Sequence, residues 1–472
     1  MITVCFEKRG KTGLCEFLYD SIKSQILDGT LKANEKLPSK RNLSSNLGVS
    51  VITVQNAYSQ LASEGYIFSI EKKGFFVTDL DISESEKKAL SKKDFFPDKS
   101  EKNENSGAEK KYFADFSSNS TSCEKFPFNL WSKVSRKVLT SEREILLERT
   151  EVKGVFELRK ALSKYLKEFR NMEVSPNQIV IGSGTESLYT MVVQLLGRKM
   201  RYAVENPGYK KVSKIFQLNG AKVFPIFIDS NGIDSISLEK IDANVVHISP
   251  SHHFPTGIVM PVKRRQELLL WAQKENHYII EDDYDSEFRF IGKPLNTLQS
   301  EDKNESVIYI NTFSKTLSPS FRISFMVLPE KLLRTFEEKF NFFTSGVSSF
   351  EQFTLARFIN EGFFAKHIIR MKNYYKNLRN LLIENLEKSR IFNRIKIQEE
   401  ESGLHFLMQI NSQKNVEEIS RELKEKGVNI PLLKDYYYND APKEKNSIFV
   451  VNYSGIKKED ISKIVKILEE VI

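Results

Sequence analysis

The sequence predicts an α/β protein with a mostly parallel central sheet, preceded by a small unit that is mainly helical. Two observations predict this organisation. Residues 82–111 are charged and poor in aliphatic side chains, which is typical of a flexible linker. Beyond this segment, strand-like and helix-like patterns alternate, as in a parallel sheet covered by helices. We therefore expect a first unit over 1–80, a linker over 81–112, and a large unit over 113–472 whose smaller C-terminal α+β lobe begins near residue 340.

The net charge of the chain allows many kinds of partner, whereas its cysteines indicate a reducing compartment. A formal net charge of +9 permits a polyanionic partner without requiring one, because the charge is spread over 472 residues. Cys5, Cys15 and Cys123 have no metal-binding spacing and suit a reducing compartment. No apolar run reaches the ~18–20 residues of a membrane span, and no secretory signal opens the chain. We expect a soluble, cytoplasmic protein.

The first unit begins with two helices. Apolar residues recur at helical spacing from Leu14 to Ile26, and an Asp-Gly pair ends that helix. Ser39 can cap a short second helix that stops at Gly48. A tight turn therefore separates this helix from the next one.

A third helix and a hairpin complete the unit. Ser50 can cap this helix, and Gly65 ends it. Its predicted apolar positions are Val51, Val54, Tyr58 and Leu61. Residues 66–77 then predict a hairpin around the sequence EKKG. The order of helix, tight turn, helix and two-stranded wing is that of a winged helix-turn-helix.

This arrangement predicts a DNA-binding surface, because the second helix of such a motif fits the major groove. Lysines and an arginine flank that helix and can neutralise phosphates. The residues that we expect at DNA are Lys40, Arg41, Ser50, Thr53, Gln55, Asn56, Lys72, Lys73 and Gly74. The pattern alone also allows a small helical domain with ordinary surface lysines, or a winged helix that docks a protein.

The stretch LPSKRNLSSNLGVSVITVQNAYSQLASEGYIFSIEKKGFFV resembles the GntR family of bacterial regulators from Leu37 to Val77. The resemblance implies that the first unit binds double-stranded operator DNA. Where that family usually has an arginine after GVS, this chain has Val51. A phosphate or base contact is therefore expected to be missing there.

In the large unit, polar loops follow predicted strands. The sequence QIVIGSGTESLYTMVVQLL predicts a strand, a glycine loop and a helix. Four further segments each predict a strand with a polar loop at its C-terminal end: RYAVENPGYKK, NVVHISPSHHFPTG, YIIEDDYDSEF and VIYINTFSK. Ligands bind at the carboxyl ends of such strands, so we expect these loops to converge.

Individual loops carry weak signals. The loop 182–185 precedes a helix and suits a phosphate, although a tight turn would need the same glycines. Tyr209 can stack on a flat ring or be an ordinary loop aromatic. Four carboxylates within 281–285 follow a buried strand and need a positive partner. A metal is the alternative, but no suitably spaced His or Cys supports it, and we expect His252 and His253 to hold loops.

The stretch VIYINTFSKTLSPSFRISFMVLP, residues 307–329, adds Lys315 and Arg322 between two core strands. The combined set of side chains meets the needs of pyridoxal 5′-phosphate (PLP). PLP needs an amine for its aldehyde, a carboxylate for its ring nitrogen, a stacking face, and N–H groups with an arginine for its phosphate. Each residue type alone is ordinary, but together they predict a PLP site.

SHHFPTG, EDDYDSEF and TFSKTLSPSFRISFMVLP resemble the fold-type I, PLP-dependent aminotransferases, and the resemblance runs from about residue 113 to the end. Together with the GntR-like head, the chain resembles the MocR regulators, of which GabR and PdxR are members. The resemblance implies that Lys315 forms the Schiff base, Asp282 pairs with the ring nitrogen, Tyr284 reaches the ring hydroxyl and Tyr209 stacks on the ring. It assigns the phosphate to Ser183, Gly184, Thr185, Thr312 and Arg322. It also implies a head-to-tail homodimer.

Two positions depart from the family pattern. GabR holds its effector's carboxylate with two arginines, and this chain has Lys211 and Gly455 at the matching positions of its expected effector pocket. Lysine keeps the charge but loses the bidentate fork. We therefore expect neither γ-aminobutyrate sensing nor efficient transamination.

The function that we expect is a DNA-binding regulator that uses PLP or a PLP adduct as its signal, in vitamin B6 or amino-acid metabolism. Two alternatives remain at this stage. One is an active aminotransferase whose head is a docking module. The other is a degenerate scaffold without a cofactor.

Overall fold

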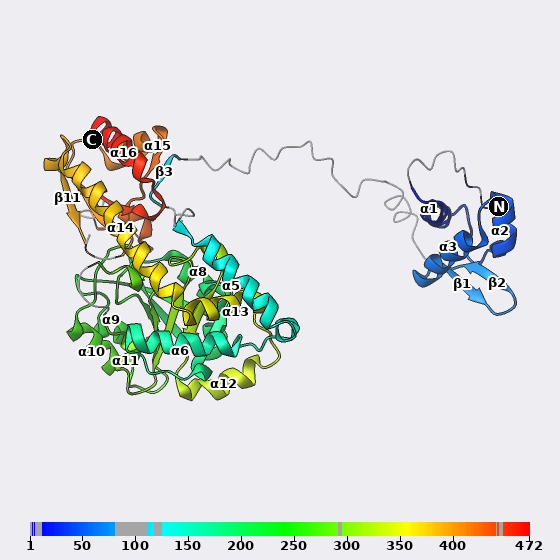
Figure 1. Cartoon of the computed structure of the whole chain (residues 1–472), viewed down its shortest axis with the longest axis horizontal. Coiled ribbons are helices and arrows are strands. Elements are labelled where there is room, and N and C mark those ends of the chain that lie inside the picture. The colour runs from blue at the N-terminus through cyan, green and yellow to red at the C-terminus, as the bar shows by residue number, and fades with distance from the viewer. Residues whose placement is uncertain are drawn as a thin grey trace. The chain divides into compact units, whose positions relative to one another are not determined.

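The computed structural model describes residues 2, 4, 12–80, 112–117, 125–290, 295–399, 401, 403–439, 441–442 and 447–472. The chain divides into two compact units, Met1–Ala108 and Glu109–Ile472 (Figure 1). The predicted linker over 81–112 lies outside the described residues, apart from Tyr112. Within the described parts, no helix has the length and apolar character that crossing a membrane requires.

The first unit is a winged helix-turn-helix, as predicted. Its elements are α1 (Leu14–Leu27), α2 (Lys40–Leu47), α3 (Val51–Ser63), β1 (Ile67–Ile70) and β2 (Gly74–Val77). The Ser39 side chain accepts a hydrogen bond from the Asn42 N–H at the start of α2, and Gly48 ends that helix with φ of 66°. Strands β1 and β2 pair antiparallel to form the wing.

The core of this unit forms where α3 packs on α1. Val54, Ala57, Tyr58 and Leu61 of α3 are fully buried. The prediction that Val51 belongs to this apolar face is wrong, because its side chain is 42% exposed. Val51 is the first residue of α3, so its side chain projects from the helix end, beyond the buried stripe.

A mixed, mostly parallel sheet of seven strands forms the centre of the second unit, as predicted. Its order is β4-β10-β9-β8-β7-β5-β6. These strands are β4 (Ile179–Gly182), β5 (Arg201–Asn206), β6 (Lys222–Phe227), β7 (Val245–Ile248), β8 (Tyr278–Asp282), β9 (Val307–Thr312) and β10 (Ser324–Val327). Only β10 among them runs antiparallel to its neighbours, β4 and β9. The edge strand β6 was not predicted, because its mixed sequence KVFPIF is only partly buried.

Helices cover both faces of the sheet. One face packs against α7 (Thr185–Leu196), α8 (Lys210–Leu218) and α12 (Glu330–Phe340). The other packs against α5 (Phe128–Ser141), α6 (Phe156–Arg170), α9 (Ser235–Lys240), α10 (Val262–Trp271), α11 (Leu298–Glu301) and α13 (Ser349–Asn360). Burial on both faces explains why the central strands are continuous apolar runs. It also restricts polar chemistry to the strand ends.

The predicted C-terminal α+β lobe is present. It contains α14 (Phe363–Glu387), α15 (Val416–Glu425), α16 (Ile461–Val471) and the antiparallel strands β11 (Ile395–Gln398), β12 (His405–Ile410) and β14 (Ile448–Asn452). A short parallel pair joins β3 (Ala114–Asp115) to β13 (Val428–Asn429). The lobe has its own core, to which residues from Met371 onward contribute, together with Ala114 and Phe116.

Candidate functional site

A pocket lies where the loops after β5, β7, β8 and β9 meet the N-terminus of α7. The predicted site residues that line it are Thr185, Tyr209, Lys211, Asp282, Tyr284, Thr312, Lys315 and Arg322. The structure thus brings together residues that span more than a hundred positions of the sequence. This convergence follows from the parallel strand order, because the carboxyl ends of parallel strands lie at one edge of a sheet.

Ser183 and Gly184, also predicted to bind the phosphate, do not line the pocket but lie next to Arg322, which does. Nη2 of Arg322 donates a hydrogen bond to the Ser183 carbonyl at 3.3 Å. Gly184 has φ of 92°, and a Cβ there would lie 2.3 Å from Arg322 Nη2. Glycine is therefore required at this position for the arginine to reach the turn. The N-terminal N–H groups of α7, which begins at Thr185, are available to an anion.

The two positions expected to bind an effector do not come together. Lys211 lines the pocket, but Gly455 lies at the exposed end of a short helical turn, Tyr453–Gly455, and does not line it. The C-terminal lobe contributes Tyr438 to the pocket instead. A role for Gly455 in effector binding stays a prediction.

Lys315 lies at the floor of the pocket and is 8% exposed. Burial lowers the pKa of its amine to about 8, and the negative charge of Asp285 opposes the shift. Burial disfavours the charged ammonium, so a large fraction of the amine is neutral near pH 8. A neutral amine is the form that attacks a carbonyl carbon.

Asp282 is held by α7 and β7. Its Oδ2 accepts a hydrogen bond from the Tyr189 hydroxyl at 2.6 Å and lies 3.5 Å from His247 Nε2. Its Oδ1 is buried and has no hydrogen-bond partner in the described part of the protein. A buried carboxylate oxygen without a donor is costly, so the position is suited to an N–H donor from a ligand in the pocket.

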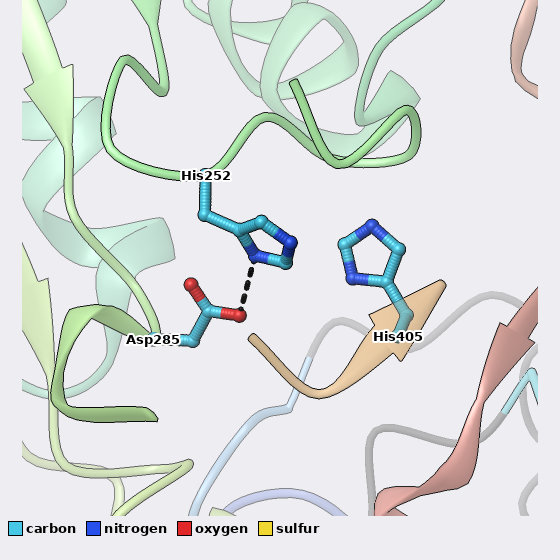
Figure 2. A group of neighbouring side chains, drawn as sticks. All are labelled: His252, Asp285 and His405. Carbon is cyan, nitrogen blue, oxygen red and sulfur yellow. Dashed lines mark hydrogen bonds and ion pairs between the residues drawn. The ribbon is translucent and has the colours of Figure 1, made fainter. Parts of the chain in front are cut away.

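Behind the pocket, Tyr284 contacts a buried cluster formed by His252, Asp285 and His405. The Tyr284 hydroxyl lies 3.2 Å from His252 Nδ1, which also lies 2.9 Å from Asp285 Oδ2. In Figure 2 the imidazole of His405, from β12, faces that of His252, and the ring centroids are 4.5 Å apart. Burial lowers the pKa of His405 well below its usual value. The C-terminal lobe therefore contacts the cluster behind the pocket through a neutral imidazole.

The same three side chains could hold a metal ion, since their ligand atoms lie within 4.8 Å of one another. The sequence argument against a metal used spacing along the chain, and this group comes from two loops and from the first residue of β12. The hydrogen bond between His252 and Asp285 already gives these two side chains a partner, and His405 packs its ring against that of His252. The arrangement is therefore sufficiently explained as a network that fixes the position of Tyr284.

An unpredicted carboxylate, Glu186, lies between the two cations at the mouth of the pocket. Its Oε2 is 2.5 Å from Arg322 Nη2, and its Oε1 accepts a short hydrogen bond from Lys211. Burial alone would raise the pKa of Glu186, but the hydrogen bonds from Lys211 and Arg322 outweigh it and lower the pKa to about 2. Glu186 is thus ionised at every physiological pH and binds both cations.

Sequence reasoning missed several other lining residues. Glu186 and Tyr189 lie one and four residues after Thr185, so helical spacing from the glycine loop could have found both. Glu205, at the end of β5, is buried, and burial raises its pKa to about 8. Tyr438 comes from the distant C-terminal lobe, and no local pattern signals it.

The predicted DNA-contacting residues lie on α2, on α3 with its N-cap, and on the wing. Arg41, Gln55, Asn56, Lys72, Lys73 and Gly74 are exposed. The Ser50 hydroxyl accepts from the Thr53 N–H at 3.0 Å, so its first role is to cap α3. Lys40 Nζ lies 5.4 Å from the centre of the Phe75 ring, which holds this lysine against the wing.

Two family descriptions match the chain. Residues 115–468 match aminotransferase class I and II, and residues 14–77 match bacterial regulatory proteins, gntR family. A solved archaeal alanine:glyoxylate aminotransferase superposes with a TM-score of 0.67 at 23% identity, covering 76% of this chain and 90% of that chain. This likeness shows the fold, which is that of the fold-type I aminotransferases.

Three relatives match both units together. The chain is 34% identical to the HTH-type transcriptional regulator YdeL of Bacillus subtilis, over 97% of this chain and 96% of YdeL. It is 28% identical to the probable rhizopine catabolism regulatory protein MocR of Rhizobium meliloti, over 93% and 90% of the two chains. It is 25% identical to the pyridoxine biosynthesis transcriptional regulator PdxR of Corynebacterium glutamicum, over 89% and 88%.

Proposed function

Because the chain belongs to the aminotransferase class I and II family and begins with a gntR-family regulatory segment, we propose that this HTH-type transcription regulator binds PLP and uses it as its signal. The observation that carries the proposal is the pocket that unites Lys315, Asp282 and Arg322 in a chain with a DNA-binding head.

The pocket residues fit PLP in three respects. Asp282 Oδ1 lacks a hydrogen-bond donor within the described residues, and a protonated ring nitrogen would supply one. Gly184 leaves room for Arg322 beside the N-terminus of α7, which suits a phosphate. Lys315 has a lowered pKa, which suits an amine that reacts with an aldehyde.

Each side chain would then have a defined task. When bound, PLP supplies an aldehyde that condenses with the Lys315 amine. Asp282 would hold the ring nitrogen's proton, and Tyr189 and His247 keep that carboxylate oriented. Tyr284, fixed by His252, would donate to the ring hydroxyl, and Tyr209 would cover the ring. Ser183, Gly184, Thr185, Thr312 and Arg322 would bind the phosphate.

The cationic side chains of the pocket favour a sensing role over sustained transamination. Aminotransfer needs a second cationic group for the substrate's carboxylate, and an arginine fork is the usual form of it. Arg322 is the only arginine among the described residues that line the pocket, and Lys211 is already paired with Glu186. The resemblance of the whole chain to PdxR, named for pyridoxine biosynthesis, supports PLP as the signal.

The physical basis of signalling would be linkage. PLP that binds one arrangement of a homodimer more tightly than another shifts the population, and with it the affinity for DNA. A dimer would present two heads to two operator half-sites. The proposal requires that the affinity for DNA differs with and without PLP. It holds whether PLP strengthens or weakens DNA binding.

The experiment is a DNA-binding titration of the full chain with a duplex from upstream of its own gene. We expect PLP to change the affinity for DNA, and Lys315→Ala to remove that change. Leu218→Ala, which alters a side chain 86% exposed outside the pocket, is the matched control. An affinity that is identical at every PLP concentration contradicts the proposal.

A working aminotransferase is the second candidate, because the lowered pKa of Lys315 also suits turnover. It predicts sustained transfer of amino groups from an amino acid to a 2-oxo acid. Repeated turnovers would favour this candidate. A single turnover, or none, would leave the PLP-responsive regulator as the favoured function.

A further inference from the structure

The exposed face of helix α3 carries no charged side chain. Its exposed residues are Val51, Ile52, Gln55, Asn56, Ser59, Gln60 and Ser63. The first acidic residue beyond them, Glu64, is occupied by a hydrogen bond from the Tyr19 hydroxyl and another from Gln60 Nε2 at 3.1 Å. A ligand that contacts this face therefore meets only aliphatic groups, amides and hydroxyls.

This composition restricts which bases the helix can recognise. In the major groove, arginine and lysine read guanine, and aspartate and glutamate read cytosine. Neither kind of side chain is present on the exposed face of α3. Asparagine and glutamine read adenine, and apolar groups contact the methyl group of thymine. The helix thus contains the amide and apolar readers of A·T pairs and lacks the charged readers of G·C pairs, while its serines can contact either kind of pair.

Val51 and Ile52 occupy the first turn of α3, and their side chains are 42% and 71% exposed. A single exposed aliphatic residue is ordinary, but two adjacent ones here stand where a recognition helix contacts base edges. Gln55 lies one turn further along the exposed face, four residues after Val51. Apolar and amide groups are therefore presented side by side.

Charge around the helix favours a nucleic acid over a protein as the occupant. Residues 12–80 contain seven Lys or Arg and seven Asp or Glu, and residues 1–80 have a formal net charge of only +2, so net charge gives the unit little general attraction for polyanions. Four of these seven cationic side chains lie on α2 (Lys40 and Arg41), which packs on α3, and in the turn of the wing (Lys72 and Lys73). Neutral readers flanked by cations match the neutral base edges and charged phosphates of a groove.

We propose that α3 selects A·T base pairs, with Val51 and Ile52 against thymine methyl groups and Gln55 and Asn56 on adenine edges. The operator half-site is A·T-rich beneath this helix. This rests on the proposed function, because it specifies the DNA that the head binds. Burying one methyl-sized group changes affinity about fourfold, which sets the size of the expected effect.

The test begins with selection of duplexes from a random library by the full chain, in buffer of low salt. Thymines of the selected half-site are then replaced one at a time by deoxyuridine, which lacks only the methyl group. We expect at least one replacement to weaken binding about fourfold. Ile52→Ala should weaken binding to the thymine duplex similarly and lose the distinction between thymine and uracil at that position.

The controls separate this proposal from the function on which it rests. Ile369→Ala alters an isoleucine of the second unit that is 60% exposed, and should leave affinity and thymine preference unchanged. Failure to select any duplex overturns both proposals. Selection of half-sites rich in G·C, or binding indifferent to every uracil replacement, overturns this inference and leaves the regulator in place. Ile52→Ala changing the oligomeric state but not DNA binding also overturns it, because Ile52 would then serve a protein contact.

Discussion

Glu186 should weaken PLP binding, because it occupies Arg322, the cation that we assign to the phosphate. Its carboxylate bridges Arg322 and Lys211, and the hydrogen bonds lower its pKa to about 2. A phosphate that binds Arg322 has to share the guanidinium with this carboxylate and approach its negative charge. Glu186→Gln removes the charge and keeps the shape of the side chain.

The size of the change in PLP affinity follows from how exposed the ion pairs of Glu186 with Arg322 and Lys211 are. The Arg322 and Glu186 side chains are 51% and 29% exposed, so solvent screens the interaction. Exposed pairs contribute roughly 0.2–1 kcal/mol each, and two pairs give about 0.5–2 kcal/mol. Glu186→Gln should therefore tighten PLP binding roughly two- to thirtyfold.

The assay is an absorbance titration of the apoprotein with PLP at two salt concentrations. The gain in affinity should shrink at high salt, because the interaction is electrostatic. Glu239→Gln removes a comparable surface partner, that of Lys274, and should leave PLP affinity unchanged. Weaker PLP binding by Glu186→Gln would refute the reasoning, since it would mean that Glu186 orients Arg322 for the phosphate.

Three further predictions follow from buried and exposed charges. The pKa of Lys315 is lowered to about 8 in the folded protein. Between about pH 8 and 10.5 the Lys315 amine is therefore protonated in the unfolded chain and neutral in the folded protein, so folding becomes more favourable as the pH rises. The apoprotein should therefore gain stability of about 3 kcal/mol across that range relative to Lys315→Met, and denaturation at several pH values measures it. Asp283→Ala should destabilise the second unit by about 3–5 kcal/mol in urea denaturation, because Arg170 Nη2, 2.5 Å from Asp283 Oδ2, is left buried without its carboxylate partner and keeps only a hydrogen bond to Ser251. An unchanged midpoint would contradict it. Lys40→Ala should reduce the slope of log K against log salt by about 0.9 if Lys40 contacts one phosphate, and an unchanged slope removes that contact.

The sequence predicted the elements whose signals are local. Caps at Ser39 and Ser50, a stop at Gly48 and the wing hairpin were all readable, because each depends on a few neighbouring residues. The exposure of Val51 could not be predicted, because the spacing of apolar residues does not reveal where the neighbouring helix stops covering the apolar face of α3. Strand β6 was missed because a proline interrupts its apolar residues.

The sequence could predict those residues of the candidate site that have distinctive side chains and lie at the ends of clear strands. Asp282 ends a clear strand, Lys315 follows one and Arg322 precedes one, so the sheet places all three at the same edge. Glu186 was missed although it adjoins Thr185, since a carboxylate beside a predicted phosphate site is unexpected. His405 and Tyr438 could not be predicted, because their places depend on how the C-terminal lobe packs against the loops.

The measurement that tests PLP signalling most directly is a closed cycle of four affinities. DNA affinity is measured with and without PLP, and PLP affinity with and without DNA, on the same full-length protein and duplex. Linkage requires the two ratios to be equal, and we predict a shared ratio of at least about fivefold. Ratios of one on both sides of the cycle would contradict PLP as the signal.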